Sequence, residues 1–233
     1  MKVGVVTGFI PLPVKHLSAY QYLDLGLRLA AACEGATQWV VYQGRLEDCW
    51  AYDLCTGLPP ANPPPEDRYP TPEINVMSHI VQHNRTTWAM KAARGCPEID
   101  VWVWFDYGLL KQGFWKNNPI TKDVVKSFLD RLAATKSLDV IPFPGIDDKE
   151  MVMPTGNNWR FCGSTHIWPT QFLAALDAEY KTALQKWIGA WNTVPLDLPI
   201  WALVEQNSGL PFRWYPAEYD ASQLTGFNPG DYQ

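Results

Sequence analysis

A run of five apolar residues that ends in a carboxylate is the feature that most constrains the fold of this chain. Val101–Phe105 (VWVWF) contains only β-branched and aromatic residues, which is typical of a buried strand. Asp106 follows the run directly. In open α/β sheets, ligands bind at the carboxyl ends of the strands. The run therefore predicts a functional carboxylate at a sheet edge, against the alternative of a loop Asp that caps the next segment.

The order of the other elements predicts an α/β fold. Residues 2–8 and 38–42 have the pattern of strands, and a helix over about 18–34 separates them, with a capping-box pattern at Ser18 and Gln21. Two strands joined by a helix at this spacing pair in parallel. Further helices are expected at about 72–94, 121–136, 170–191 and 197–206, and further strands at 139–143 and 212–215. We expect a mostly parallel central sheet flanked by helices.

The chain has the length and composition of one globular domain. Its 233 residues are 47% apolar, which is enough for one large core. We expect a single domain over residues 1–220 and a C-terminal tail over 221–233, where no pattern is evident. The Pro-rich segment 57–72 predicts an extended surface loop within that domain.

Cysteine usage and hydropathy favour a cytoplasmic protein. The five cysteines are odd in number and none has CxxC spacing, which fits neither a zinc site nor a disulfide framework. The apolar run at the N-terminus is too short for a signal peptide, and no stretch of 18 apolar residues predicts a membrane span. The net charge of −5 argues against a generally basic nucleic-acid binder.

The common motifs for nucleotide binding and hydrolysis are missing from the sequence. No GxGxxG follows the first strand, and no GxxxxGK[ST] or GxSxG occurs anywhere. His79 and His83 stand four residues apart, but without the Glu of HExxH we expect solvated or packed histidines. Arg85, Lys91 and Arg94 on the same expected helix could bind phosphates, although an exposed basic face is the favoured interpretation.

Two later segments offer groups that suit a hydroxyl-rich ligand. Residues 157–166 combine amide, guanidinium and indole groups with Gly163, which permits close approach; the alternative is an ordinary turn before a helix. Glu205 lies near a helix C-terminus, where the unfavourable dipole raises a carboxyl pKa and suits a general base; the alternative is a solvated terminal Glu.

Taken in order, these features resemble the GT-A-type nucleotide-sugar glycosyltransferases. The matching parts are a first strand whose end holds the nucleotide (residues 5–9), a basic helix, and an apolar strand that ends in a DxD-like motif, Asp106-Tyr107-Gly108. A glycine-bearing acceptor segment (residues 161–164) and the late acid Glu205 follow. The resemblance spans about residues 2–215 and implies a Rossmann-like GT-A domain that transfers a sugar from a UDP-sugar or another nucleoside-diphosphate sugar to a hydroxyl acceptor.

The resemblance also implies roles for individual residues. Glu205 would be the base and Asp106 would act in the catalytic centre. The implied donor-binding residues are Thr7, Gly8, Phe9, Arg85, Lys91, Asp106 and Gly108. The implied acceptor-binding residues are Trp115, Trp159, Arg160, Gly163 and Ser164.

A divalent cation, Mn²⁺ or Mg²⁺, is implied on the donor diphosphate. The second Asp of the DxD motif is Gly108 here, so Asp106 would need a further ligand. The candidates for that ligand are His166, Asp147 and Asp148. The alternative is a metal-free site in which Arg85 and Lys91 neutralise the diphosphate.

Other functions stay open at this point. A sugar-phosphate nucleotidyltransferase and a non-catalytic sugar- or partner-binding module fit the same sheet. Residues 111–136 carry a net charge of +4, with Phe114 and Trp115 among the first charges, so a hydroxymethylated base in DNA is a possible acceptor. A glycan or small-molecule hydroxyl is the favoured acceptor, because the acidity of the whole chain opposes binding to a phosphate backbone.

Overall fold

The structure is a computed structural model that describes residues 1–12, 19–61, 71–107, 109–110, 118–145, 162–218 and 220–232. Its central sheet has four strands in the order β2-β1-β3-β5. They are β1 (Val3–Phe9), β2 (Gln38–Gln43), β3 (Val101–Phe105) and β5 (Thr165–Pro169). β1 pairs in parallel with β2 and with β3, whereas β5 runs antiparallel to β3. The expected α/β fold with a mostly parallel sheet is confirmed.

A second, smaller sheet completes the β structure. β4 (Ile141–Gly145) pairs in parallel with β6 (Phe212–Pro216), and β4 contacts β5. Both strands were expected from the sequence, and β4 begins two residues later than predicted. Short elements are η1 (Leu46–Asp48), α2 (Tyr52–Cys55), α8 (Ser222–Thr225) and η2 (Pro229–Tyr232).

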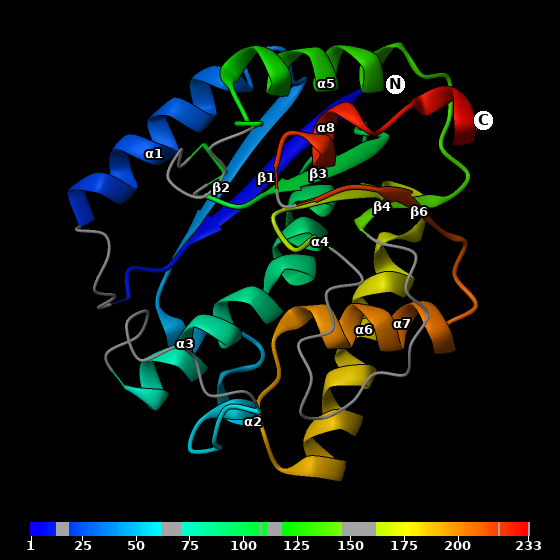
Figure 1. The fold of residues 1–233 in the computed structure, drawn as a ribbon. Helices are drawn as coiled ribbons and strands as arrows, with labels where there is room; N and C mark the ends of the chain where they lie inside the picture. Colours follow the sequence, from blue (N-terminus) through cyan, green and yellow to red (C-terminus); the bar gives the residue numbers. More distant parts are fainter. Residues whose placement is uncertain are drawn as a thin grey trace.

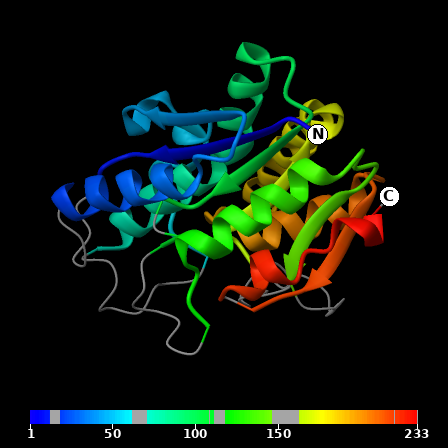
Figure 2. The ribbon, with the colours of Figure 1, turned by 90° about the horizontal axis from the view of Figure 1, so that it is seen from above.

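Long helices cover both faces of the central sheet. α1 (Ala19–Ala32) and α5 (Lys122–Ala134) lie side by side on one face (Figures 1 and 2). α3 (Pro72–His83), α4 (Arg85–Gly95), α6 (Thr170–Trp191) and α7 (Asp197–Asn207) lie on the other face (Figure 1). Within the described residues no helix combines the length and the apolar character that a membrane crossing requires.

The alternation of side chains along β3 divides the core between these two faces. Val101, Val103 and Phe105 pack in the cluster under α1 and α5, whereas Trp102 and Trp104 pack in the cluster under α4, α6 and α7. Both faces are buried, which explains why the strand is apolar at every position. Side chains alternate between the two faces along a strand, so Asp106 is the next position on the same side as Trp102 and Trp104.

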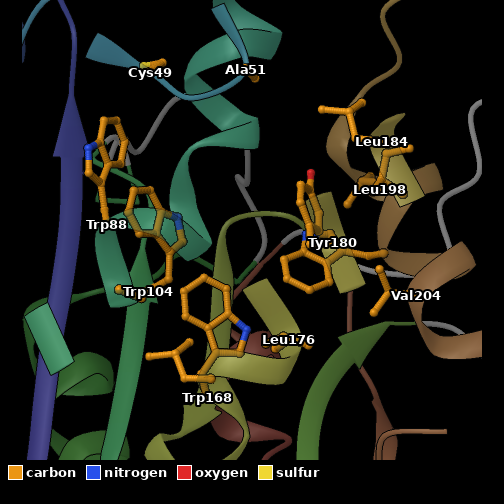
Figure 3. Close-up of a cluster of buried hydrophobic side chains, with 14 of the residues drawn as sticks. Cys49, Ala51, Trp88, Trp104, Trp168, Leu176, Tyr180, Leu184, Leu198 and Val204 are labelled. Atoms are coloured by element: carbon orange, nitrogen blue, oxygen red, sulfur yellow. The ribbon is translucent and has the colours of Figure 1, made fainter. Parts of the chain in front are cut away.

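Tryptophans form the core on that side. Figure 3 shows Trp88, Trp104 and Trp168 in a row beside β1 and β3. The rings of Trp88 and Trp104 are stacked with centroids 5.9 Å apart. A Cβ atom on Gly8 would lie 2.1 Å from a ring carbon of Trp88. Gly8 is therefore required by the packing of α4 on β1.

The prediction of a single helix over 72–94 was wrong in one respect, because this segment forms two helices, α3 and α4, which are separated at Asn84. Trp50 holds the break: its backbone N–H donates to Asn84 Oδ1 (3.2 Å) and its Nε1 donates to the His83 carbonyl (2.9 Å). These contacts come from a distant segment, so the helical pattern in the sequence does not contain them. The break reorients the chain and lets Arg85 begin a new helix.

Two elements were not anticipated from the sequence. β5 occupies residues that were expected to form a polar segment or a turn before the helix. The tail beyond Ala221, which has no clear sequence pattern, packs against α5. The ring of Phe227 meets the ring of Phe128 edge-on, with centroids 5.7 Å apart, and Arg131 donates a hydrogen bond to the Leu224 carbonyl.

Candidate functional site

The candidate site lies where β1 and β3 end and β5 begins. The ends of the two parallel strands share one edge of the sheet, and the antiparallel β5 starts at that edge, with Thr165 opposite Phe105. The backbone N–H of Asp106 donates to the Ser164 carbonyl (2.9 Å). The structure therefore brings together two segments that the sequence had singled out separately, Asp106 and the pair Gly163–Ser164.

The Asp106 carboxylate is oriented and partly open. Its Oδ1 accepts hydrogen bonds from Arg85 Nη2 (2.8 Å) and Trp104 Nε1 (2.9 Å). The Asp106 side chain is 34% exposed, so it is not enclosed by these partners. The charged guanidinium of Arg85 and the neutral indole N–H of Trp104 therefore restrict the orientation of the carboxylate. A binding or reacting group requires a restricted orientation of this kind.

Arg85 is the centre of the cluster, and the interpretation of its helix as an exposed basic face was wrong for this residue. The side chain is 7% exposed, whereas Lys91 and Arg94 lie on the surface of α4. Arg85 Nη1 donates to the Gly163 carbonyl (2.8 Å) and to Asp197 Oδ2. The guanidinium also lies over the Trp104 ring, 5.5 Å from its centroid.

Asp197 is the member of the cluster that the sequence reasoning missed. It is the first residue of α7, it is buried, and it forms an ion pair with Arg85. Burial raises the pKa of Asp197, the Arg85 charge opposes that rise, and Asp106 adds to it. An acid in the first turn of the helix was visible in the sequence, but only the acid at the other end of that helix, Glu205, was chosen.

His166 stands behind Arg85, on the inner side of the cluster. Its Nε2 lies 3.2 Å from the Gly163 carbonyl and 3.4 Å from Arg85 Nη1. Burial, reinforced by the Arg85 charge, holds the pKa of His166 well below its ordinary value. The imidazole is therefore neutral at pH 7.

The three predicted donor-binding residues of β1 help to build the edge. The Thr7 hydroxyl is buried and donates to the Phe105 carbonyl (2.7 Å), which ties β1 to β3. The ring of Phe9 stacks on Tyr107 with centroids 5.1 Å apart. Gly8 packs beneath α4, as described above. Contact of these residues with a ligand stays a prediction.

Several predicted residues lie apart from the cluster or outside the described residues. Lys91 is six residues beyond Arg85 on α4, about 9 Å along the helix axis. Glu205 is eight residues beyond Asp197 on α7, about 12 Å along the axis. Ser164 is at the edge, where its hydroxyl donates to Gln223 Oε1 (2.6 Å). Gly108, Trp115, Trp159, Arg160, Asp147 and Asp148 lie outside the described residues.

The described residues do not by themselves complete a metal site. Among them, no group of three or more His, Cys, Asp or Glu side chains is arranged to hold an ion. The proposed pair of Asp106 and His166 is separated by the Arg85 guanidinium, which contacts both. The cluster offers one guanidinium, that of Arg85, against two carboxyl groups, those of Asp106 and Asp197.

The two histidines of α3 are packed in the interior. His83 Nδ1 lies 2.8 Å from the Tyr180 hydroxyl and its Nε2 lies 3.0 Å from the Pro195 carbonyl. The carbonyl can only accept, so Nε2 carries the proton and the Tyr180 hydroxyl donates to Nδ1. Burial, with smaller contributions from His79 and Arg85, lowers the pKa of His83 to about 3. His79 is also buried.

Comparison with known proteins identifies a likeness of fold. No family model matches the chain, and no curated protein matches it in sequence. A solved structure, described as that of a glycosyltransferase involved in the glycosylation of the major capsid of PBCV-1, superposes with a TM-score of 0.50. The match has 13% sequence identity and covers 93% of this chain and 81% of the other. This chain therefore has a mixed α/β fold, with a mostly parallel sheet, that is similar to the fold of a glycosyltransferase.

Proposed function

We propose that the chain is a glycosyltransferase of the GT-A type, which moves a sugar from a nucleoside-diphosphate sugar to a hydroxyl acceptor at the edge beside Asp106. One observation carries the proposal. A partly open carboxylate stands at the carboxyl end of β3 and is held by Arg85 and Trp104. Ligand sites of α/β sheets form at this edge. The likeness of fold to a glycosyltransferase supports the same assignment.

The proposed reaction consists of two bond changes and one proton transfer. The bond between the anomeric carbon and the diphosphate oxygen breaks, a bond from the acceptor oxygen to that carbon forms, and the hydroxyl proton passes to a base. Asp106 would accept a hydrogen bond from the donor and so orient it, while Arg85 holds the carboxylate in place. Glu205 remains the proposed base, and its distance along α7 makes it the first part of the proposal to test.

The leaving diphosphate needs positive charge that this cluster does not supply. The guanidinium of Arg85 is already engaged by the carboxyl groups of Asp106 and Asp197. A cation from outside the cluster must therefore meet the developing charge. We propose Lys91 or a divalent ion for this role, and dependence of turnover on Mn²⁺ or Mg²⁺ separates them.

A glycan or small-molecule hydroxyl is the favoured acceptor over modified DNA. The cations described on α5 have local partners, which lowers the positive potential that a phosphate backbone would meet. Lys126 lies 3.7 Å from Asp130, and Lys122 lies 3.9 Å from Glu34. Arg131 donates to Ser127 and to the Leu224 carbonyl.

The test is release of nucleoside diphosphate from a panel of nucleotide sugars, with and without Mn²⁺, measured by chromatography. We expect slow release by the wild-type protein and at least about tenfold slower release by Asp106→Asn, because an oriented charge is lost. Asp100→Asn is the matched control, since Asp100 flanks the opposite end of β3, where its carboxylate accepts from the Lys2 backbone N–H.

Two results would contradict the proposal. Formation of pyrophosphate from a sugar phosphate and a nucleoside triphosphate would indicate nucleotidyl transfer instead. Equal release by the folded Asp106→Asn and Asp100→Asn proteins would remove Asp106 from the site.

A further inference from the structure

A groove between α6 and α7 lies apart from the Asp106 edge. Its volume is about 270 Å³, close to the lower end of the range for small-molecule sites, which starts at about 300 Å³. It is lined by the last three turns of α6 and the last turn of α7, two helices that contact each other (Figure 1). Its α7 residues are Leu203, Val204 and Asn207, which are six to ten positions beyond Asp197, roughly 9–15 Å along the helix axis.

An exposed indole forms one wall of the groove. Trp191 is 39% exposed and is the most exposed tryptophan among the residues that the structure describes. The ring of Trp187 meets it edge-on, with centroids 4.1 Å apart, and holds its orientation. Trp187 is itself buried, and its Nε1 has no acceptor in the part of the chain that is described. Both indoles line the groove, and Trp191 is the more exposed of the two.

Polar groups of both hydrogen-bonding kinds also line the groove. Glu179 offers acceptors, Lys186 offers donors, and the two side chains have no ion-pair partner within the described ranges. Asn207, which also lines the groove, donates its amide N–H to the Leu203 carbonyl, and its amide oxygen is an acceptor. One acid and one base give the groove a net charge of zero, so an anionic ligand such as a nucleic acid or a phospholipid headgroup gains no electrostatic advantage.

We propose that this groove binds a neutral carbohydrate, with a pyranose ring stacked on Trp191. A pyranose has an apolar C–H face that matches an indole, and hydroxyls that both donate and accept, which matches Glu179, Lys186 and Asn207. The ligand class is thus set by an aromatic wall, a mixed polar rim and a balanced charge. The inference does not depend on the proposed transferase activity, because it concerns binding at a separate place.

The experiment follows the indole N–H signals of the ¹⁵N-labelled full-length chain by NMR. The chain has 12 tryptophans, and the signals of Trp187 and Trp191 are identified by their loss in Trp187→Phe and Trp191→Phe. The probes are the methyl pyranosides of glucose, galactose, mannose and N-acetylglucosamine, each added to about 10 mM, which is tenfold above a Kd of about 1 mM. We expect saturable shifts of the Trp191 and Trp187 signals with at least one probe.

Variants then locate the binding. Trp191→Ala should weaken the affinity, followed at the Trp187 signal, by at least about tenfold, whereas Trp191→Phe keeps a flat ring and most of the affinity. Lys186→Met, on the exposed rim, is the second variant, and a several-fold loss is expected from the missing donors. Leu27→Ala is the control, because Leu27 is an exposed apolar residue of α1 outside the groove.

Any of three results would overturn the inference. The first is that no probe moves any of the tryptophan indole signals. The second is that Trp104, beside Asp106, responds while Trp191 does not, which would place the sugar at the edge of the sheet. The third is that an apolar peptide shifts Trp191 and the pyranosides do not, which would make the groove a protein contact. Asp106→Asn should bind the probes in the groove as the wild type does, so failure of the proposed transfer reaction leaves this test intact.

Discussion

Replacement of Arg85 by Met is the change that probes the cluster most severely. Met has a similar length and no charge, so the substitution leaves Asp197 buried without its cation and Asp106 without its main donor. Removing one partner of a buried ion pair costs about 3–5 kcal/mol, because the remaining charge is uncompensated. Asp106 is partly exposed, so water replaces part of what it loses. We attribute most of the cost to Asp197.

The assay is equilibrium unfolding by denaturant and by heat. For a chain of this size, 1 kcal/mol corresponds to about 2–4 °C in Tm, so Arg85→Met should unfold roughly 6–20 °C below the wild type. The double variant Arg85→Met/Asp197→Leu removes both buried charges and should recover most of the loss. The single and double variants differ only at Asp197, which makes them a matched pair.

The pH dependence provides a second, independent readout of the Arg85→Met protein. Without the guanidinium, burial raises the pKa of Asp197 further above its value of about 3.9 in the unfolded chain. The folded state then holds more protons than the unfolded state between these two pKa values, so its stability falls as pH rises through that interval. The loss of stability in Arg85→Met, relative to the wild type, should be small near pH 4 and largest near pH 7. A deficit under about 1 kcal/mol at pH 7 would show that the pair behaves as an exposed one, and would refute the reasoning.

Three further predictions concern the core and the proposed base. Burial lowers the pKa of His83 to about 3, against 6.5 in the unfolded chain, so the unfolded state binds a proton first as pH falls. The free energy of unfolding should therefore be highest above pH 6.5 and should fall by about 1.4 kcal/mol per pH unit between pH 6.5 and 3. Denaturant unfolding at pH 7 and pH 5 should show this slope, and His83→Gln should reduce it. Gly8→Ala forces a Cβ into Trp88 and should cost about 1–3 kcal/mol in denaturant unfolding, whereas no loss would mean that the ring moves freely. Glu205→Gln should lower kcat about 100-fold with donor affinity unchanged, and an unchanged kcat would assign the proton to another group.

The sheet and its candidate edge beside Asp106 follow closely from local patterns. The apolar run of β3 and its terminal Asp106 were predicted at their observed positions, as were the parallel pairing of β1 with β2 and the extents of α5 and α6 to within two residues. These elements are long, periodic or strongly capped, so their own residues decide their structure. Thr121, for example, caps α5 by accepting from the Val124 N–H.

The residues that complete the cluster could not be found by the same reasoning. The burial of Arg85 depends on Asp106, 21 positions away, and on Asp197, 112 positions away, and no local pattern records such partners. β5 is five residues long and takes its structure from pairing with β3, not from its own periodicity. The break at Asn84, which places Arg85 at a helix start, is likewise held by the distant Trp50.

The most direct measurement is the thermal shift of the wild-type and Asp106→Asn proteins with nucleoside-diphosphate sugars, each with and without Mn²⁺. A ligand that binds only the folded state raises Tm, and at 100 times its Kd it adds about 2.7 kcal/mol of stability. We predict a rise in Tm with at least one donor for the wild type and a much smaller rise for Asp106→Asn. No rise with any donor under either condition, or an equal rise in both proteins, would contradict a donor site at the edge of the sheet beside Asp106.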